Sequence, residues 1–193
     1  MNFTVVVGNP RPESRTLGIA LAAAEALAES LGLPAGPGVV DLSVLARRLL
    51  LPEPSAAIED ATDEVLSADL LLVASPTVNG TYSGLLKVFL DRLPYKGLQD
   101  RAALPLLVMD SPLHALAVDV HLRPLLVELG ASVPAPGLAV LESELDELDR
   151  VLHGWTGQVA EALGREVLSR QVPGRPTPGR HLPGREAALS GRH

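Results

Sequence analysis

Short apolar runs alternate with stretches of helical periodicity along most of this chain. The apolar runs are rich in Val and Leu, and they predict buried strands at residues 5–7, 39–41, 69–74, 104–109 and 138–141. Apolar residues at helical spacing between and after them predict helices at residues 15–27, 43–50, 58–67, 85–93, 115–129 and 142–169. The connections hold turn residues, including the 75–84 segment, which we expect to be a loop.

Strands that alternate with helices indicate a parallel sheet with right-handed crossovers and helices on both faces. We therefore expect one α/β domain over residues 1–170. Five strands in this rhythm favour a flavodoxin-like, doubly wound five-stranded parallel sheet in the order 2-1-3-4-5. Ligands of such sheets bind beyond the carboxyl ends of the strands, so the loops at 8–14, 75–84 and 110–114 should form one pocket.

The first of these loops has the features of an anion site. Ser14 is well placed to cap the helix that begins at Arg15, and a helix N-terminus presents unpaired N–H groups and the positive end of the dipole. Arg11, Asn9 and Thr16 add a guanidinium, an amide and a hydroxyl. The segment is neither GxGxxG nor a P-loop, and an ordinary capped turn is the alternative interpretation.

Composition excludes several classes of function. The chain has no cysteine, and its five histidines form no HxxxH or HExxH pair, so we expect no metal site. A net charge of −7 and 3% aromatic residues argue against nucleic-acid binding. The sequence holds no run of about 18 uncharged apolar residues and no signal-peptide pattern, so we expect no membrane span and a cytoplasmic protein.

Charge divides the chain near residue 170. Residues 171–193 carry four Arg and one Glu, a net charge of +3, which leaves −10 on the preceding part. Pro-Gly-Arg occurs three times in this tail. Such a composition predicts a disordered or loosely draped segment outside the domain. The alternative is a basic flap over an anionic cofactor or a partner subunit.

Three blocks, GNPRPESRT (8–16), SPTVNGTYSGLLKVFLDRL (75–93) and HALAVDVHLRPLLVELGA (114–131), together resemble the NAD(P)H-dependent FMN reductase family. The likeness is to its branch that supplies reduced flavin to two-component monooxygenases, and it covers residues 1–169. It implies that the first block holds the FMN phosphate. The matching positions are Gly8, Arg11, Ser14 and Thr16, and Asn9 stands where a serine is usual.

The resemblance also implies where the flavin ring would lie. The second block would line the ring with Pro76, Thr77, Val78, Asn79 and Gly80; an aromatic residue is common at the position of Val78. The third loop would approach the pyrimidine edge of the ring, and it adds Ser111 and His114 as candidates. Asp110 and Pro112 depart from the glycine-containing stretch that is frequent there. A structural role is expected for His114, with acid–base chemistry as the alternative.

The resulting hypothesis is an NAD(P)H:FMN oxidoreductase with FMN and NADPH (or NADH) as cofactors. No catalytic side chain is expected, because the hydride passes between nicotinamide and flavin. The family implies a homodimer or homotetramer and a flavin-dependent monooxygenase as recipient of the reduced flavin. Three alternatives remain: a flavin-binding electron carrier, a catalytically degenerate flavodoxin-like subunit, and a quinone or azo reductase.

Overall fold

The computed structural model describes residues 1–170 except 35, 52 and 54, and the side chains of 165–170 are not described. The strands of this part are β1 (Phe3–Val7), β2 (Gly38–Asp41), β3 (Leu70–Val78), β4 (Thr81–Tyr82), β5 (Ala102–Met109) and β6 (Leu138–Leu141). Its α-helices are α1 (Arg15–Leu31), α2 (Ala56–Ser67), α3 (Gly84–Leu90), α4 (Arg123–Glu128) and α5 (Leu148–Arg170). The Pro-Gly-Arg tail lies outside the described residues, so the two-part division of the chain stays a prediction.

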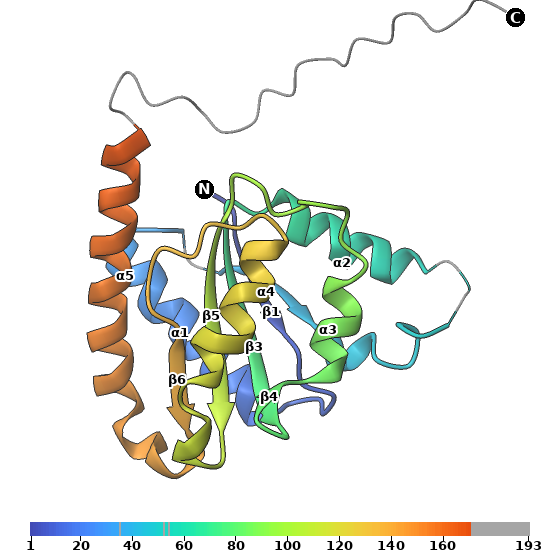
Figure 1. The fold of residues 1–193 in the computed structure, drawn as a ribbon, viewed down its shortest axis with the longest axis horizontal. Helices are drawn as coiled ribbons and strands as arrows, with labels where there is room; N and C mark the ends of the chain where they lie inside the picture. Colours follow the sequence, from blue (N-terminus) through green and yellow to red (C-terminus); the bar gives the residue numbers. More distant parts are fainter. Residues whose placement is uncertain (35, 52, 54, 171–193) are drawn as a thin grey trace, which may run out of the picture.

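The sheet has the order β2-β1-β3-β5-β6, and all four of these pairings are parallel. The short β4 pairs antiparallel with the end of β3. When β4 is left out of the count, the five parallel strands stand in the order 2-1-3-4-5 (Figure 1). The predicted doubly wound fold is confirmed.

Two hydrophobic cores lie on the two faces of the sheet. Because side chains alternate along a strand, Val5 and Val7 of β1 join the core beneath α1 and α5, whereas Val6 joins the core beneath α2, α3 and α4. Strands covered on both faces are mostly apolar, and β1 is buried throughout; its one polar residue, Thr4, donates its hydroxyl to Glu64 Oε1 (3.1 Å). Figure 1 shows α1 and α5 on one side of the sheet and α2 and α3 on the other.

Pro105 lies inside β5 rather than at its start. The N–H of Ala103, two residues earlier, donates to Ser132 O on the side of β6 (2.8 Å), and β6 pairs with β5 only from Leu106 onward. The missing N–H of Pro105 therefore faces a gap in the pairing, where no ladder hydrogen bond is lost.

The segment after β2 does not form the helix expected at residues 43–50. It begins with a 3-10 turn, η1 (Leu42–Val44), and continues through turns in which Arg48 N–H donates to Leu45 O and Leu51 N–H to Arg48 O. Leu45 and Leu49 are buried, so the apolar spacing was correctly recognised. A segment this short gains too little from helical hydrogen bonds to offset nucleation, and packing sets its path instead.

Two further expectations are wrong in detail. The loop expected at 75–84 is partly a hairpin: β3 continues to Val78, and Asn79 and Gly80, with φ of 51° and 79°, form the turn into β4. Positive φ at both turn residues is typical of the type I′ turn that Asn-Gly favours. The helix expected at 115–129 is preceded by a 3-10 turn, η2 (Pro112–His114), and contains a π-helical turn, η3 (Val118–Leu122), just before Pro124.

The C-terminal helix also begins later than expected. Residues Glu142–Glu147 form a 3-10 segment, η4, in which Glu144 departs from helical geometry, and α5 follows. Within the described residues, no helix combines the length and apolar character needed to cross a bilayer. The same part of the chain holds no cluster of His, Asp and Glu able to bind a metal ion.

Candidate functional site

Three loops meet at the carboxyl edge, the edge of the sheet where β1, β3 and β5 end (Figure 1, bottom). Gly8 N–H at the end of β1 donates to Ala74 O of β3 (2.8 Å). On the other side, a Cβ built on Gly80 in the hairpin turn would lie 3.7 Å from the His114 ring. The predicted convergence of the loops at 8–14, 75–84 and 110–114 is thus present in the structure.

Ser83 joins the first two loops. Its hydroxyl donates to Gly8 O and accepts from Leu86 N–H (3.1 Å), so it caps α3 and bonds to the first loop at once. Its own N–H donates to the buried hydroxyl of Ser75 (2.8 Å). The sequence analysis did not identify this network, because a Ser before an apolar helix predicts a cap but not a tertiary contact.

Gly8 is required by close packing. A Cβ at this position would lie 2.5 Å from Leu86 Cβ, a separation that side chains do not adopt. The absence of a side chain lets α3 approach the end of β1 closely. The glycine therefore sets the spacing of the first two loops.

The first loop is stabilised by its own side chains. Asn9 Nδ2 donates to Thr16 Oγ1 (2.9 Å), and Asn9 Oδ1 accepts from Arg11 N–H (2.9 Å). Ser14 caps α1 as predicted, since its Oγ accepts from Leu17 N–H (3.2 Å). In both contacts the hydroxyl oxygen is the acceptor. Ser14 is half-buried, so its O–H proton can reach a ligand, whereas Thr16 is buried and supports the loop from within.

Two arginines flank this helix start and differ in their partners. Arg15 Nη1 donates to Glu142 Oε2 at 2.7 Å, an ion pair that ties α1 to the end of β6. Arg11 is exposed, and within the described residues its guanidinium forms no hydrogen bond or ion pair. Of the two, Arg11 has its charge available to an anion at the N-terminus of α1.

The hairpin combines an apolar tip with one unused polar atom. Pro76 and Thr77 are half-buried, Val78 is 46% exposed, and Asn79 lies in the exposed turn. Thr77 Oγ1 is buried and has no hydrogen-bond partner among the described residues. Buried hydroxyls are nearly always paired in native proteins, so this atom can bond a group that these residues do not supply.

The third loop is organised differently. Ser111 Oγ accepts from Leu113 N–H (3.3 Å) and caps the η2 turn, so its oxygen is used locally. His114 ends that turn, with Nδ1 3.5 Å from Oδ1 of the largely exposed Asp110. Nδ1 is buried and forms no hydrogen bond with the described part of the chain. His114 packs against the hairpin turn, an arrangement that agrees with a structural role.

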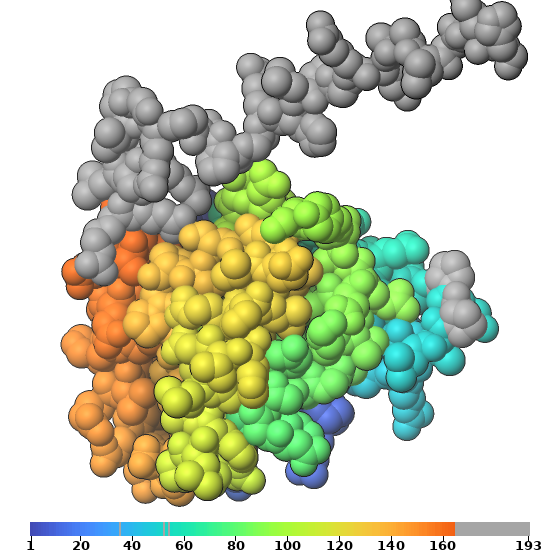
Figure 2. Space-filling model, in the orientation of Figure 1, coloured from blue at the N-terminus to red at the C-terminus, as the bar shows by residue number. Residues whose placement is uncertain are grey.

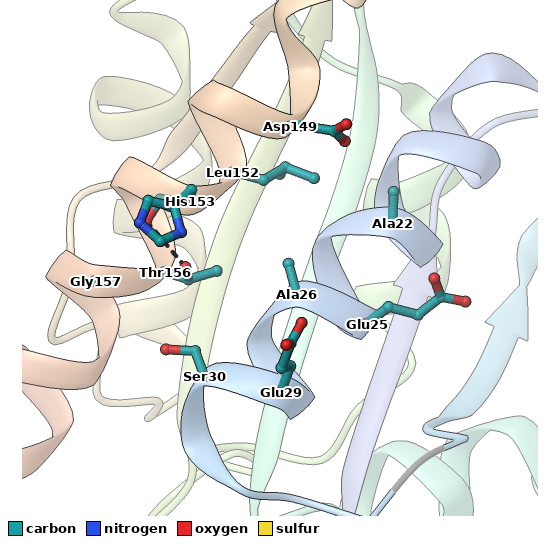
Figure 3. Close-up of a pocket in the computed structure, with 10 residues that line it drawn as sticks. All are labelled: Ala22, Glu25, Ala26, Glu29, Ser30, Asp149, Leu152, His153, Thr156 and Gly157. Carbon is teal, nitrogen blue, oxygen red and sulfur yellow. Dashed lines mark hydrogen bonds between the residues drawn. The ribbon is translucent and has the colours of Figure 1, made fainter.

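The structure has a hollow of about 590 Å³ elsewhere, between α1 and α5. Figure 3 shows its lining residues, none of which belongs to the three loops.

Comparisons with known proteins agree with this site. Residues 1–146 match the family model described as NADPH-dependent FMN reductase. An FMN reductase (NADPH) from Pseudomonas aeruginosa is 36% identical over 143 residues, which cover 72% of this chain and 75% of that protein. One from Escherichia coli is 38% identical over 91 residues, 47% of this chain and about half (48%) of its own length.

Among solved structures, an NADH:FMN oxidoreductase (EMOB) in its apo form superposes with a TM-score of 0.69 at 26% identity. The superposition covers 89% of this chain and 99% of that one. The family match spans three quarters of the chain and includes all three loops of the carboxyl edge. The chain belongs to the NADPH-dependent FMN reductase family of NAD(P)H:FMN oxidoreductases.

Proposed function

We propose that this chain binds FMN at the carboxyl edge and reduces it with NADPH or NADH. The observation that carries the proposal is the set of unused donors at the start of α1. Among the described residues, the hydroxyl proton of Ser14 and the guanidinium of Arg11 have no partner, and Thr16 supports the loop from its buried position, next to a capped helix N-terminus. These groups fit the phosphate of FMN, which accepts several hydrogen bonds and carries negative charge.

The hairpin supplies a position for the ring. Residues 76–80 would line it, as expected from the sequence, and the unpartnered Thr77 hydroxyl would contact one of its polar atoms. Val78 presents an exposed apolar surface in place of an aromatic side chain, so it would pack against the flavin without stacking on it. This predicts a weaker hold on the ring than on the phosphate.

When bound, FMN supplies the redox chemistry by accepting a hydride from the nicotinamide. The protein's own contribution is positional. Arg11 and Ser14 hold the phosphate, Thr16 supports their loop from its buried position, and the hairpin orients the ring so that one face stays open to the second nucleotide. His114 supports the Gly80 turn and transfers no proton in this scheme.

The test is an assay of NADPH and NADH oxidation, in which the absorbance of the reduced nucleotide is monitored with and without added FMN. The proposal predicts nucleotide consumption that depends on FMN and saturates with it. Failure to oxidise either nucleotide at saturating flavin would contradict the proposal. If FMN is a passing substrate, purified protein should be colourless and should still support turnover.

The proposal includes the fate of the product. Weak contact at the ring favours release of reduced FMN, so a flavin-dependent monooxygenase would receive it, in the cytoplasm as expected from the sequence. An assay that couples the chain to such a monooxygenase across a dialysis membrane separates two routes. Product formation across the membrane supports free diffusion of the flavin, and activity only on direct mixing supports transfer in a complex.

We further propose that the chain forms a homodimer or homotetramer through the segment from η2 to α4. Its exposed apolar side chains, spaced as on one face of a helix, are Leu113, Leu116, Val120 and Val127. Figure 2 shows this segment, in yellow-green to yellow, open across the front of the molecule. An apolar stripe can pair with its own copy about a two-fold axis.

Light scattering after size-exclusion chromatography tests this assembly. Leu116→Glu should lower the measured mass to that of one chain, because it places a charge in the centre of the stripe. Val44→Glu is the matched control, since Val44 is 73% exposed and Leu116 74% exposed, on different elements. Equal masses for the wild type and Leu116→Glu would contradict the proposal.

A further inference from the structure

The hollow between α1 and α5 is a groove with small side chains along its floor (Figure 3). Ala22 of α1 lies opposite Leu152 of α5, and Ala26 lies opposite the buried Thr156. We call it the α1–α5 groove. Its two helices also pack against the core through Leu27 and Leu152, so its walls are fixed parts of the fold.

The charged side chains that line the α1–α5 groove are three carboxylates. Asp149 points from α5 toward α1, Glu29 stands over the floor, and Glu25 lies on the outer rim (Figure 3). None of the three forms a hydrogen bond or ion pair with another described residue. Glu25 and Glu29 are four residues apart on one helix, where like charges repel.

Neighbouring bases do not neutralise this groove. Arg150 is bonded to Glu147, and that hydrogen bond and charge raise the pKa of the guanidinium. The remaining polar side chains on the wall, His153, Thr156 and Ser30, form no ion pair with the three carboxylates among the described residues. The groove therefore presents an uncompensated negative charge above a narrow floor.

The chain itself carries a complementary segment. Residues 171–193 hold four Arg and one Glu, with three Pro-Gly-Arg units at 173–175, 178–180 and 183–185. They begin where α5 ends, thirteen residues beyond Gly157, a helical distance of about 20 Å. Twenty-three residues can span at most about 75 Å, so the second and third units can reach every part of the groove.

We propose that the α1–α5 groove is the docking site of the chain's own C-terminal segment, and that it takes one Pro-Gly-Arg unit at a time. The part of α1 that lines it, from Ala22 to Ser30, is about 12 Å long, enough for about four residues of extended chain. The guanidinium of the docked unit lies between Glu29 and Asp149. Its glycine passes over the Ala22–Ala26 floor.

Tethering makes this contact effective. A single exposed ion pair is weak, but a segment joined to the same chain acts at an effective concentration in the millimolar range. Arginine can also bond a carboxylate through two parallel N–H groups. Three equivalent units raise the occupancy without any one of them being fixed. Docking here also keeps the basic segment on α1 and α5, away from the loops of the carboxyl edge.

Paramagnetic broadening in the full-length protein tests the proposal. Because the chain has no cysteine, Thr177→Cys gives a single site for a nitroxide label between the first two units. We expect loss of amide signal intensity for residues 22–30 of α1 and 149–157 of α5, and none for α2. About 0.5 M NaCl, with a Debye length of about 4 Å, should restore the intensity.

Charge variants make the result specific. Glu25→Lys with Glu29→Lys should abolish the broadening, and so should replacement of Arg175, Arg180 and Arg185 by Glu, which leaves the described fold untouched. A chain that combines the two lysine substitutions with the three glutamate substitutions should show the broadening again. The matched control is Glu59→Lys with Asp63→Lys, an exposed acidic pair of the same spacing on α2, which should change nothing.

Four results would overturn the proposal. One is equal broadening on α1 and α2, and another is broadening that survives the Glu25→Lys and Glu29→Lys exchange. The third is broadening at residues 8–14, which would mean a flap over the carboxyl edge. The fourth result comes from a sample in which ¹⁵N-labelled chains are mixed with separately spin-labelled chains, so that only docking between chains causes broadening. Broadening of the same strength in that sample would assign the groove to the segment of a second copy and contradict docking within one chain.

Discussion

The first and third loops of the carboxyl edge lie at the ends of strands in the same sheet, yet they are prepared for different tasks. In the first, Asn9 and Ser14 organise the backbone while the Arg11 guanidinium has no partner in the described residues. In the third, Ser111 is used as a local cap and the exposed Asp110 places a negative charge near the site. The comparison supports the proposal that the first loop holds the phosphate of FMN, and it finds no matching set of free donors in the third loop.

The largest expected effect comes from the glycine on which the first loop depends. Gly8→Ala places a methyl group 2.5 Å from Leu86 Cβ and forces α3 away from β1, and such overpacking destabilises by about 1–3 kcal/mol. The midpoint of thermal unfolding should fall by about 3–10 °C, and FMN affinity should fall with it.

Gly18→Ala is the control for this variant, because a Cβ there meets nothing within 4 Å and Gly18 lies in the first turn of α1. It should stabilise the protein by about 0.5–1 kcal/mol. A Gly8→Ala protein that melts no earlier than the wild type would show that the close approach of α3 is unnecessary.

The next effect concerns the bridge between the first two loops. Ser83→Ala removes the hydroxyl that bonds Gly8 O and Leu86 N–H, and loss of such a cap costs about 1–2 kcal/mol. Denaturant unfolding should show this loss, and FMN titration should show weaker binding because the loops are no longer held together.

Ser55→Ala serves for comparison, since Ser55 precedes α2 without a side-chain capping bond. Its effect should stay within about 0.5 kcal/mol. If both serine variants lose the same stability, the bridge has no special role.

The smallest effect sharpens the contrast with the third loop. Asp110→Asn removes an exposed negative charge near an anionic ligand, and exposed charges of this kind contribute about 0.2–1 kcal/mol. FMN should bind up to about fivefold more tightly, as measured by quenching of its fluorescence. Asp63→Asn on α2 should leave the affinity unchanged, and weaker binding by Asp110→Asn would reverse the interpretation of this loop.

Local patterns predicted the framework of the fold well. The five apolar runs correspond to the five parallel strands, and Ser14 caps α1 as its position indicated. Asn79-Gly80 carried a hairpin signal that the sequence analysis treated as part of a loop, so this miss came from overlooked turn chemistry. The π-helical turn before Pro124 was not predictable from apolar spacing, because that spacing does not distinguish α from π hydrogen bonding.

The candidate site also contains some residues that a local sequence pattern can identify and others that it cannot. The donors around Arg11 and Ser14 follow each other in sequence, so a local pattern could identify them. Ser83 and Gly8 are 75 positions apart, and the unused Thr77 hydroxyl is defined by what surrounds it in space. Contacts of that kind depend on how the elements pack, and one sequence carries no direct signal for them.

The most direct test of the central claim compares FMN with riboflavin, which lacks the phosphate, in the wild type and in Arg11→Ala. A charge-assisted contact contributes about 1.5–3 kcal/mol, so Arg11→Ala should weaken FMN binding by about 10- to 100-fold and leave riboflavin binding unchanged. Arg47→Ala, at an exposed arginine after β2, is the control and should affect neither ligand. If Arg11→Ala binds FMN as tightly as the wild type, or weakens both ligands equally, the phosphate is not held at the start of α1.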